Sequence, residues 1–445
     1  MSHSPNRFHL PGCDIPIIAR PDVCVVGGGA AGLSAAVGAA RSGLKVLLVE
    51  RYGFCGGATV AGLSGTICGL YSSGDRPEQI VFGFAGEFHD ALQRANGVAC
   101  PVPFGRTMLL PHDSLIWKEV ADQFLRESRI EVLYHTVFLE AFASEDGKVS
   151  TLVVRCMEGT VAIQPRCVVD ASGDAEVVHR VGGKTSFGAN GVVQTPTMIF
   201  RMGGVDMKRF LGVDPREIDR KVVECDKAGR YHLPRHHVYV FPIPNGHEVL
   251  CNMTRISFPD GSVPSGVKSA DLTYAEMEGR IQARAYAQFL HDNIDGFAKA
   301  YTVETGAQVG VRQSRSIIGK TRLTNEQVMQ ATKTPGAASF SAWPIEVHGV
   351  GAIKIVYLDN QTYDIPFEAM IPLQGTNLLA AGRCLSAEHE ALASARVTAQ
   401  CFGMGYAVGA ACGLMINEKI DALSLTGPLV AHWMRQHGLK TASER

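Results

Sequence analysis

The sequence lacks the features that mark several common classes of protein. Its 445 residues include 12 cysteines, but no two of them stand in a CxxC or CxxxxC spacing, which disfavours an iron–sulfur cluster or a redox disulfide. No uninterrupted run of about 18 apolar residues occurs, so we expect neither a membrane-spanning helix nor a membrane partner. Residues 1–20 contain no continuous apolar segment and no small-residue cleavage site. They therefore argue against a signal peptide and favour a reducing, cytoplasmic location.

An excess of charge of either sign is also absent. Lysine plus arginine total 42, and aspartate plus glutamate total 43. Without a basic excess, the chain has no overall electrostatic attraction for nucleic acid, and we expect no such partner. Hydrophobic residues make up 46% of the chain against 19% charged residues, which is enough for a large buried core. A chain of this length predicts two domains that share a core.

The first motif that carries chemistry lies at residues 22–50, DVCVVGGGAAGLSAAVGAARSGLKVLLVE. Two apolar runs, 23–26 and 45–49, are typical of strands buried on both faces of a parallel sheet. Between them lie a glycine turn and an alanine-rich helical pattern. This order is the setting in which the pyrophosphate of a dinucleotide binds at the N-terminus of a helix. The residues expected there are Gly27, Gly29, Ala30, Ala31 and Gly32.

An acidic residue and a second glycine pair follow the second strand. Glu50 stands 23 positions after Gly27, near the spacing of about 20 at which a carboxylate binds the adenosine ribose. A 2′-phosphate would be repelled there, so NADP is disfavoured. The chain continues RYGFCGGATVAGLSG, which resembles the glutathione-reductase-type FAD proteins, where this loop runs beneath the ribityl chain and flavin. The alternative is a flexible glycine loop. The residues expected at the cofactor are Arg51, Gly56, Gly57 and Ala58.

The next segment predicts two helices. The first covers 77–96, with Gly97 as C-cap, and the second covers 113–128, with Asp113 as N-cap. A series of four strands is expected after these helices. These strands are expected at 130–134, 137–142, 149–156 and 160–164. In the second of them, Val137 is expected near the cofactor.

A second glycine turn is predicted at 166–174, RCVVDASGD, where a strand leads into the turn. In the resembling class this turn returns to the nucleotide, which would place Ala171, Gly173 and Asp174 at the cofactor. A structural β-turn is the alternative.

Composition changes near residue 195. Strands are expected at 197–204 and within 237–257, and a helix at 271–295 opened by the capping box Thr273-x-x-Glu276. These elements indicate a substrate-capping domain. The expected divisions are 20–195 and 306–420 for the two parts of an FAD-binding domain, 196–305 for the substrate domain, and 421–445 for a tail helix.

Three further motifs lie in the last third of the chain: GVRQSRSIIG, PIEVHG and LAAGRCLSAEHEALASARV. Together with the glycine fingerprint, FCGGATVAGL, VVDASGD and LTYAEMEGR, they make residues 22–416 resemble the FAD-dependent oxidoreductase family often labelled "FAD_oxidored". That family is related to fumarate-reductase-like and heterodisulfide-reductase-like flavoproteins. The resemblance implies FAD as cofactor and an α/β fold, with a Rossmann-like FAD-binding domain of glutathione-reductase type and an inserted α+β substrate domain. It leaves the reaction open.

Within these motifs, residues 377–381 predict a buried strand turned by Gly382 and Arg383. Many flavoproteins carry an acidic residue after this strand, so Arg383 is a departure, and we expect it to face the pyrophosphate. Arg396 and Val397 begin a helix rich in alanine and glycine. Its positive end would stabilise the negative charge of a reduced flavin.

Side chains that could act on a substrate also lie in these motifs. His348 and His389 are candidates for proton transfer, because histidine titrates near neutral pH. Arg312, with Arg315, Arg383 and Arg396, could hold an anionic or carbonyl substrate. A structural role is the alternative for each. Weaker candidates are His112, His236, His237, Tyr239 and Cys55. The paired histidines lack the further ligands of a metal site, and we expect no metal.

These features predict an enzyme that takes a hydride from a C–H bond next to a hydroxyl or amine of a small polar molecule. No second glycine fingerprint follows a strand, so no NAD(P)H domain is expected. Reduction of an activated C=C bond is one alternative. A flavin-bound subunit of an electron-transfer or RNA-modifying complex is an alternative of another class. The electron acceptor, covalent attachment of FAD and formation of a homo-oligomer stay open.

Overall fold

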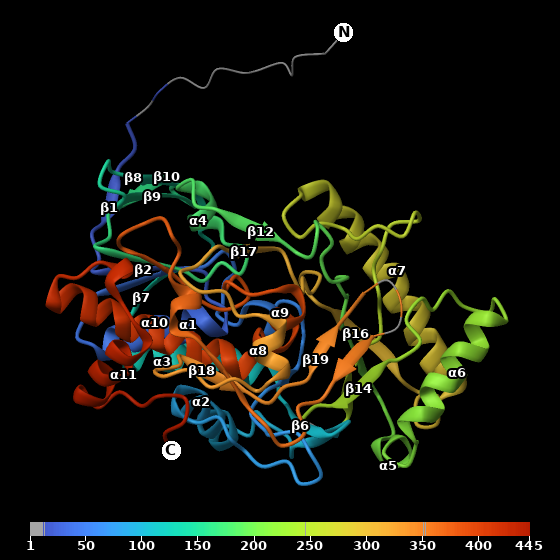
Figure 1. Ribbon diagram of the computed structural model, residues 1–445. Helices are drawn as coiled ribbons and strands as arrows, with labels where there is room; N and C mark the ends of the chain where they lie inside the picture. Colours follow the sequence, from blue (N-terminus) through green and yellow to red (C-terminus); the bar gives the residue numbers. More distant parts are fainter. Residues whose placement is uncertain (1–11, 13, 245, 350, 352) are drawn as a thin grey trace.

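In the computed structural model, residue 12 and residues 14–445 are described, apart from positions 245, 350 and 352 (Figure 1). Residues 1–11 and 13 therefore lie outside the described residues. They belong to the segment 1–20, which the sequence argues is not a signal peptide. Helices and strands alternate along the chain and form a mixed α/β structure, as the sequence predicts.

A five-stranded sheet of order β22-β11-β2-β3-β7 forms the centre of the molecule. Its strands are β2 (Val23–Val26), β3 (Val46–Val49), β7 (Glu131–Leu133), β11 (Cys167–Asp170) and β22 (Leu378–Ala380). All of its pairings are parallel. The residues of β2, β3, β11 and β22 are buried, because helices or further strands cover both faces. Parallel strands end at one edge, so the turns that follow β2, β11 and β22 meet there.

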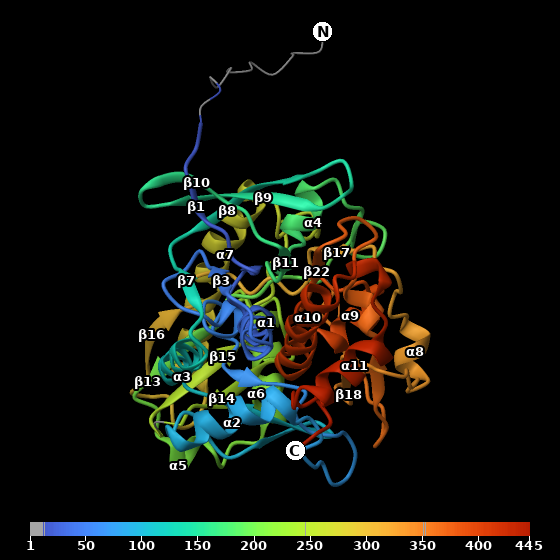
Figure 2. The same ribbon diagram turned by 90° about the vertical axis from the view of Figure 1, so that its left-hand side faces the viewer.

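Two helices pack side by side against this sheet, α1 (Ala30–Arg41) and α10 (Thr398–Glu418) (Figure 2). Glycines allow their backbones to approach closely. A Cβ added at Gly405 would lie 2.0 Å from the carbonyl oxygen of Ala31, and one at Gly409 would lie 2.0 Å from that of Ala35. The glycines of this helix therefore serve packing, as the sequence predicts.

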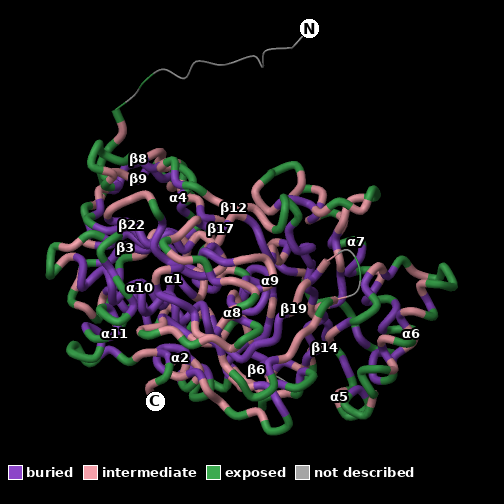
Figure 3. Tube along the Cα trace, in the orientation of Figure 1, coloured by how far each residue is buried: buried purple, intermediate pink, exposed green. Residues whose placement is uncertain are grey.

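Helix α10 is also long and apolar enough to cross a membrane, with a mean hydropathy of 1.4 over its most apolar window. Length and composition alone do not decide its environment. In this structure 94% of that window is buried inside the protein, which identifies α10 as a core helix. Figure 3 shows its path within the buried interior.

A second layer of strands lies beside the central sheet. It has the order β1-β10-β9-β8 and consists of β1 (Ile17–Ala19), β8 (Val137–Ala143), β9 (Val149–Cys156) and β10 (Gly159–Ile163). The strands predicted between 130 and 164 are thus confirmed. A small sheet contains β4 (Thr66–Ile67), β5 (Val102–Phe104) and β6 (Thr107–Pro111).

Two predicted helices lie near this small sheet, and the structure confirms one of them closely. Helix α3 (Ser114–Glu127) begins after Asp113, whose carboxylate accepts hydrogen bonds from the N–H groups of Leu115 and Ile116. Helix α2 (Gly83–Arg94) begins six residues later than predicted. Its left-handed capping residue is Asn96, with φ 56°, so the prediction that Gly97 has this role is wrong. The N–H of Gly97 closes the turn by donating to the carbonyl of Leu92.

A separate hydrophobic cluster lies between residues 198 and 311, on the side of α5, α6 and α7 in Figure 1. Its strands form an antiparallel sheet of order β14-β15-β13-β16. The elements are β13 (Phe200–Gly203), α5 (Met207–Phe210), α6 (Pro215–Lys227), β14 (Tyr239–Pro242), β15 (Glu248–Asn252), α7 (Ser269–Asn293) and β16 (Tyr301–Thr305). Domain boundaries at 196 and 305 stay a prediction.

The predicted capping box of α7 is wrong. The helix begins four residues before Thr273, and the Thr273 hydroxyl donates to the carbonyl of Ser269 within the helix. The carboxylate of Glu276 instead accepts a hydrogen bond of 2.6 Å from the N–H of Val309. A tertiary contact therefore uses the side chain that the local pattern assigned to the cap.

Of the remaining elements, β18 and α11 contact α10. The full set is α4 (Glu176–Arg180), β12 (Thr185–Phe187), β17 (Arg315–Ile317), α8 (Asn325–Met329), β18 (Ser339–Ser341), β19 (Ile345–Val347), β20 (Lys354–Val356), β21 (Tyr363–Ile365), α9 (His389–Ala395) and α11 (Gly427–Gln436). Helix α11 lies in the predicted C-terminal tail.

Candidate functional site

The turn between β2 and α1 is built from backbone alone. Gly27 has φ 101°, and a Cβ added there would lie 2.5 Å from the carbonyl oxygen of Ala171 at the end of β11. Gly29 is the N-cap of α1, and no side chain caps the helix. The N–H groups of the first helical turn and the positive end of the helix dipole are therefore available to an anion.

Gly32 has a different role from the other glycines of this turn. A Cβ added to Gly32 would lie 1.8 Å from the carbonyl oxygen of Gly27. The residue lets α1 pack against the turn, and it does not belong to the cavity lining. Gly32 belongs to the predicted fingerprint, and its contact with Gly27 is the close packing that the third glycine of that fingerprint allows.

The second glycine pair packs directly against the first turn. Gly56 and Gly57 have φ 150° and 52°, and the N–H of Gly56 donates to the carbonyl of Gly28 over 2.8 Å. A Cβ added to Gly57 would lie 2.9 Å from the Cα of Gly29. The loop is held by these contacts, which disfavours the alternative of a free glycine loop.

Glu50 fixes the start of this loop at the end of β3. Its carboxylate accepts hydrogen bonds from the N–H groups of Gly28, at 2.6 Å, and Tyr52, at 2.8 Å. The side chain is buried, and the loss of solvation raises its pKa despite these hydrogen bonds. Glu50 therefore connects the two glycine turns and also lines the cavity that they share.

The turns border a cavity of about 630 Å³, a volume within the range of ligand sites. It brings together most of the residues that the sequence predicts at a site. Those that line it are Gly27, Gly29, Ala30, Ala31, Glu50, Arg51, Gly56, Gly57, Ala58, Val137, Ala171, Gly173, Asp174, Tyr239, Arg312, His348, Gly382, Arg383, Arg396 and Val397.

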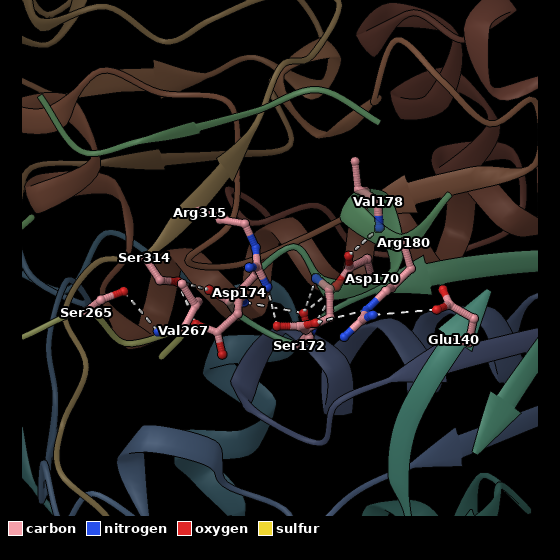
Figure 4. Close-up of polar contacts among 12 residues, drawn as sticks. Glu140, Asp170, Ser172, Asp174, Val178, Arg180, Ser265, Val267, Ser314 and Arg315 are labelled. Carbon is pink, nitrogen blue, oxygen red and sulfur yellow. Dashed lines mark hydrogen bonds and ion pairs between the residues drawn. The ribbon is translucent and has the colours of Figure 1, made fainter. Parts of the chain in front are cut away.

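Asp174 organises one wall of the cavity, and Figure 4 shows it next to Ser314 and Arg315. Its carboxylate accepts hydrogen bonds from the Ser314 hydroxyl, at 2.5 Å, and from Arg383, at 2.9 Å. Arg315 donates to the carbonyl of Asp174 and pairs with Glu176. Arg383 thus has an acidic partner, and Arg315 is not among the residues that line the cavity.

Glu346 and His348 form a buried pair in the cavity wall, with 3.1 Å between Oε1 and Nε2. Burial would raise the pKa of Glu346, but His348, Arg235 and Arg312 outweigh it and lower the pKa to about 2. Burial and the charge of Arg312 lower the pKa of His348 to about 3, even though Glu346 opposes this. At neutral pH the pair is therefore a carboxylate beside a neutral imidazole.

Sequence reasoning missed Glu346. It lies on β19, two residues before His348, and residues two apart on an extended chain project to the same side. That spacing in PIEVHG was a signal that could have identified it.

Arginine side chains surround this pair. Arg312 donates to the carbonyl of Thr195, at 2.6 Å, and the N–H of Thr195 in turn donates to the carbonyl of His348. Arg396 donates to the side-chain oxygen of Gln194 at 3.1 Å. Arg235, which sequence reasoning also missed, is 1% exposed and lies behind the lining residues.

The other predicted candidates lie outside the lining of this cavity. His389 begins α9, and His112 packs against Trp117 with 4.7 Å between ring centroids. His236 and His237 pair with Asp226 and Asp219 at the surface. Cys55 is buried, and a Cβ added at Gly28 would lie 2.8 Å from its sulfur. Within the described residues, no three His, Cys, Asp or Glu side chains are grouped to hold a metal ion.

Comparison with protein families gives a match that covers nearly the whole chain. A model described as FAD dependent oxidoreductase matches residues 22–432. The comparison with curated proteins found no match.

Comparison with solved structures finds matches at low identity. A geranylgeranyl bacteriochlorophyll reductase-like protein from Thermoplasma acidophilum is 15% identical, with a TM-score of 0.50 over 94% of this chain and 82% of that chain. The flavin-dependent brominase Bmp2 is 13% identical, with a TM-score of 0.46 over 94% and 83%. OxyS anhydrotetracycline hydroxylase from Streptomyces rimosus is 14% identical, with a TM-score of 0.43 over 94% and 66%. At 15% identity, the similarity to the reductase-like protein concerns the fold alone. No conclusion is drawn from the other two structures, because their TM-scores are below 0.5.

Proposed function

The chain belongs to the FAD dependent oxidoreductase family, and from that premise we propose that it oxidises a small polar organic molecule by hydride transfer to N5 of FAD. FAD is the cofactor of the family. The glutathione-reductase subtype, the direction of the reaction and the kind of substrate are parts of this proposal.

The turns at the edge of the central sheet fit a flavin dinucleotide. The Gly27–Gly29 turn gives an uncapped helix end for the pyrophosphate, and side chains at Gly29 and Gly57 would fill the space between the two loops. Glu50 lines the cavity and would accept hydrogen bonds from the adenosine ribose. Val397 is the N-cap of α10 and lines the cavity, so the positive end of α10 also faces the site.

The observation that carries the proposed chemistry is the Glu346–His348 pair in the wall of this cavity. When Nε2–H of a neutral His348 donates to Glu346, the other ring nitrogen keeps a lone pair that can accept a proton. In an alcohol oxidation, the C–H bond would break with its electron pair leaving as hydride, and His348 would take the hydroxyl proton. The product would be a carbonyl compound. Burial and the charge of Arg312 hold the pKa of His348 to about 3, so this step requires the bound substrate to offset the charge of Arg312 and raise that pKa. Glu346 would stabilise the imidazolium that forms.

The same residues could supply a proton in the reverse direction, so reduction of a C=C bond is the second candidate. The direction can be tested anaerobically with FAD-loaded protein. Loss of the visible flavin absorbance on addition of alcohols or amines would support oxidation. If these compounds leave the oxidised flavin unchanged while an unsaturated acid reoxidises the chemically reduced protein, the enzyme is a reductase instead.

The proposal also includes a reducing, cytoplasmic location and a small-molecule substrate, with neither nucleic acid nor a membrane as partner. The eleven described cysteines are all free thiols, which is compatible with a reducing compartment. A homo-oligomer is one of the two oligomeric states, beside the monomer, that are compatible with this proposal.

A further inference from the structure

The inner wall of the cavity and the residues directly behind it contain more positive than negative charge. Arg235 and Arg312 are 1% and 7% exposed, and Arg396 lies beside them, whereas Glu346 is the nearby carboxylate. These arginines donate hydrogen bonds to neutral oxygens of carbonyl and amide groups. In the described part of the chain, none of the three forms an ion pair with a carboxylate.

Asn252 connects two of these arginines at the end of β15. Its side-chain oxygen accepts a hydrogen bond from Arg235 at 2.8 Å and lies 3.4 Å from a guanidinium nitrogen of Arg312. Asn252 and Arg312 line the cavity, but Arg235 does not. Arg312 can therefore contact a ligand, and Arg235 acts through Asn252 as a positioning residue.

Buried charges of one sign destabilise one another unless an opposite charge joins them. Their mutual effect is visible at Arg312, where burial, then Arg235 and Arg396, hold the pKa well below its usual value. The Nε of Arg396 and the hydroxyl of Tyr239 are also buried without a hydrogen-bond partner among the described residues. Both residues line the cavity, so these two atoms are available to a ligand bound there.

Resting on the function proposed above, we propose that the substrate carries a carboxylate group that Arg312 binds, with Asn252 and Arg235 holding Arg312 in place. A guanidinium matches the two oxygens of a carboxylate in a bidentate geometry. Arg312 comes from a segment outside the glycine turns and lines the same cavity as they do. The substrate class is then a small carboxylate with an oxidisable C–H bond, such as a hydroxy acid or an amino acid.

The test uses FAD-loaded protein and probes that cannot react. Malonate, neutral malonamide and inorganic phosphate are titrated separately, and binding is measured by calorimetry and by the change in the visible flavin spectrum. Malonate is expected to bind saturably, while malonamide and phosphate bind at least tenfold more weakly. Equal binding of malonate and malonamide would overturn the inference, as would preferential binding of phosphate. Failure of malonate to bind FAD-loaded protein would also overturn it.

Variants identify the residue responsible. Arg312→Met is expected to weaken malonate binding at least tenfold, and Arg312→Lys to weaken it less, because lysine keeps the charge but loses the bidentate fork. Arg209→Met is the matched control, since Arg209 is exposed and pairs with Asp295 on the surface. Arg235→Met should weaken binding without changing the spectrum of the saturated complex. Unchanged malonate affinity in Arg312→Lys and Arg312→Met would overturn the assignment of Arg312.

The two proposals fail in different ways. Wild-type protein that does not bind FAD would contradict the proposed function before any probe is added. Protein that binds FAD and is reduced by neutral alcohols, but does not bind carboxylates, would contradict the substrate class alone.

Discussion

The two walls of the cavity are built in different ways. The nucleotide wall consists of backbone, where turns that begin at Gly27 and Gly56 meet the end of β11. The inner wall consists of side chains, where Glu346 and His348 of one segment meet Arg312 of another. A wall made of backbone requires particular residues in a contiguous pattern, which a sequence displays. A wall made of side chains requires only that distant residues meet, which a sequence does not display.

The largest effect is expected at the nucleotide wall. In Gly32→Ala, the new Cβ would lie 1.8 Å from the carbonyl of Gly27, so α1 must move away from the turn that it supports. We expect this variant to lose bound FAD during gel filtration, measured as the flavin-to-protein absorbance ratio. Gly86→Ala in α2 is the control, because its nearest contact would be an ordinary 3.8 Å. Retention of a full complement of FAD by Gly32→Ala would contradict the close packing described here.

At the inner wall, His348 and His389 can be compared directly. His348→Asn is expected to slow anaerobic flavin reduction by substrate by about 10²- to 10⁴-fold, the usual contribution of a positioned proton acceptor. FAD content should not change. His389→Asn should reduce the flavin at nearly the wild-type rate, because His389 does not line the cavity. Equal losses of the reduction rate in the two variants would contradict the assignment of His348 as the catalytic histidine and His389 as a structural one.

The pH dependence of stability gives a smaller effect. Burial lowers the pKa of His112 to about 4, whereas an unfolded histidine has a pKa near 6.5. The unfolded state then binds more protons between these values, so stability is present above about pH 6.5 and decreases as the pH falls toward 4. His348, with a pKa of about 3, acts in the same direction.

This effect can be assigned to one residue. His112→Phe should remove about 1 to 2 kcal/mol of the stability lost between pH 7 and 5. The comparison is made by urea unfolding of FAD-loaded protein at both pH values. His237→Phe is the exposed control, and its loss of stability over the same range should exceed that of His112→Phe. An acid sensitivity of His112→Phe equal to that of wild type would contradict this assignment.

The smallest expected effect is on stability, and it distinguishes two predicted helix N-caps, one confirmed and one wrong. Asp113→Ala removes an N-cap and should lower the free energy of unfolding by about 1 kcal/mol. Thr273→Ala lies inside α7 and should change it by less than about 0.5 kcal/mol. Both values come from urea unfolding at neutral pH, and a larger loss for Thr273→Ala would indicate that α7 begins where the sequence pattern predicted.

Most strands and helices could be predicted because their signals are local. The buried strand before Gly27 and the N-cap Asp113 depend on neighbouring residues, and both predictions are confirmed. The capping box at Thr273 failed because the carboxylate of Glu276 binds the backbone of Val309, which is distant in the sequence. Arg235 was missed for the same reason, since its importance depends on Asn252 and Arg312.

The amino-acid sequence by itself determined the glycine turn, the acidic residue that follows it and the helix that packs beside them, because steric limits on the backbone leave few residues that fit. Only the tertiary structure decided that more arginines than carboxylates surround Glu346 and His348 in the cavity wall. Burial is the physical reason, since a charge acquires its effect from the groups and solvent around it, and these are set by chain packing.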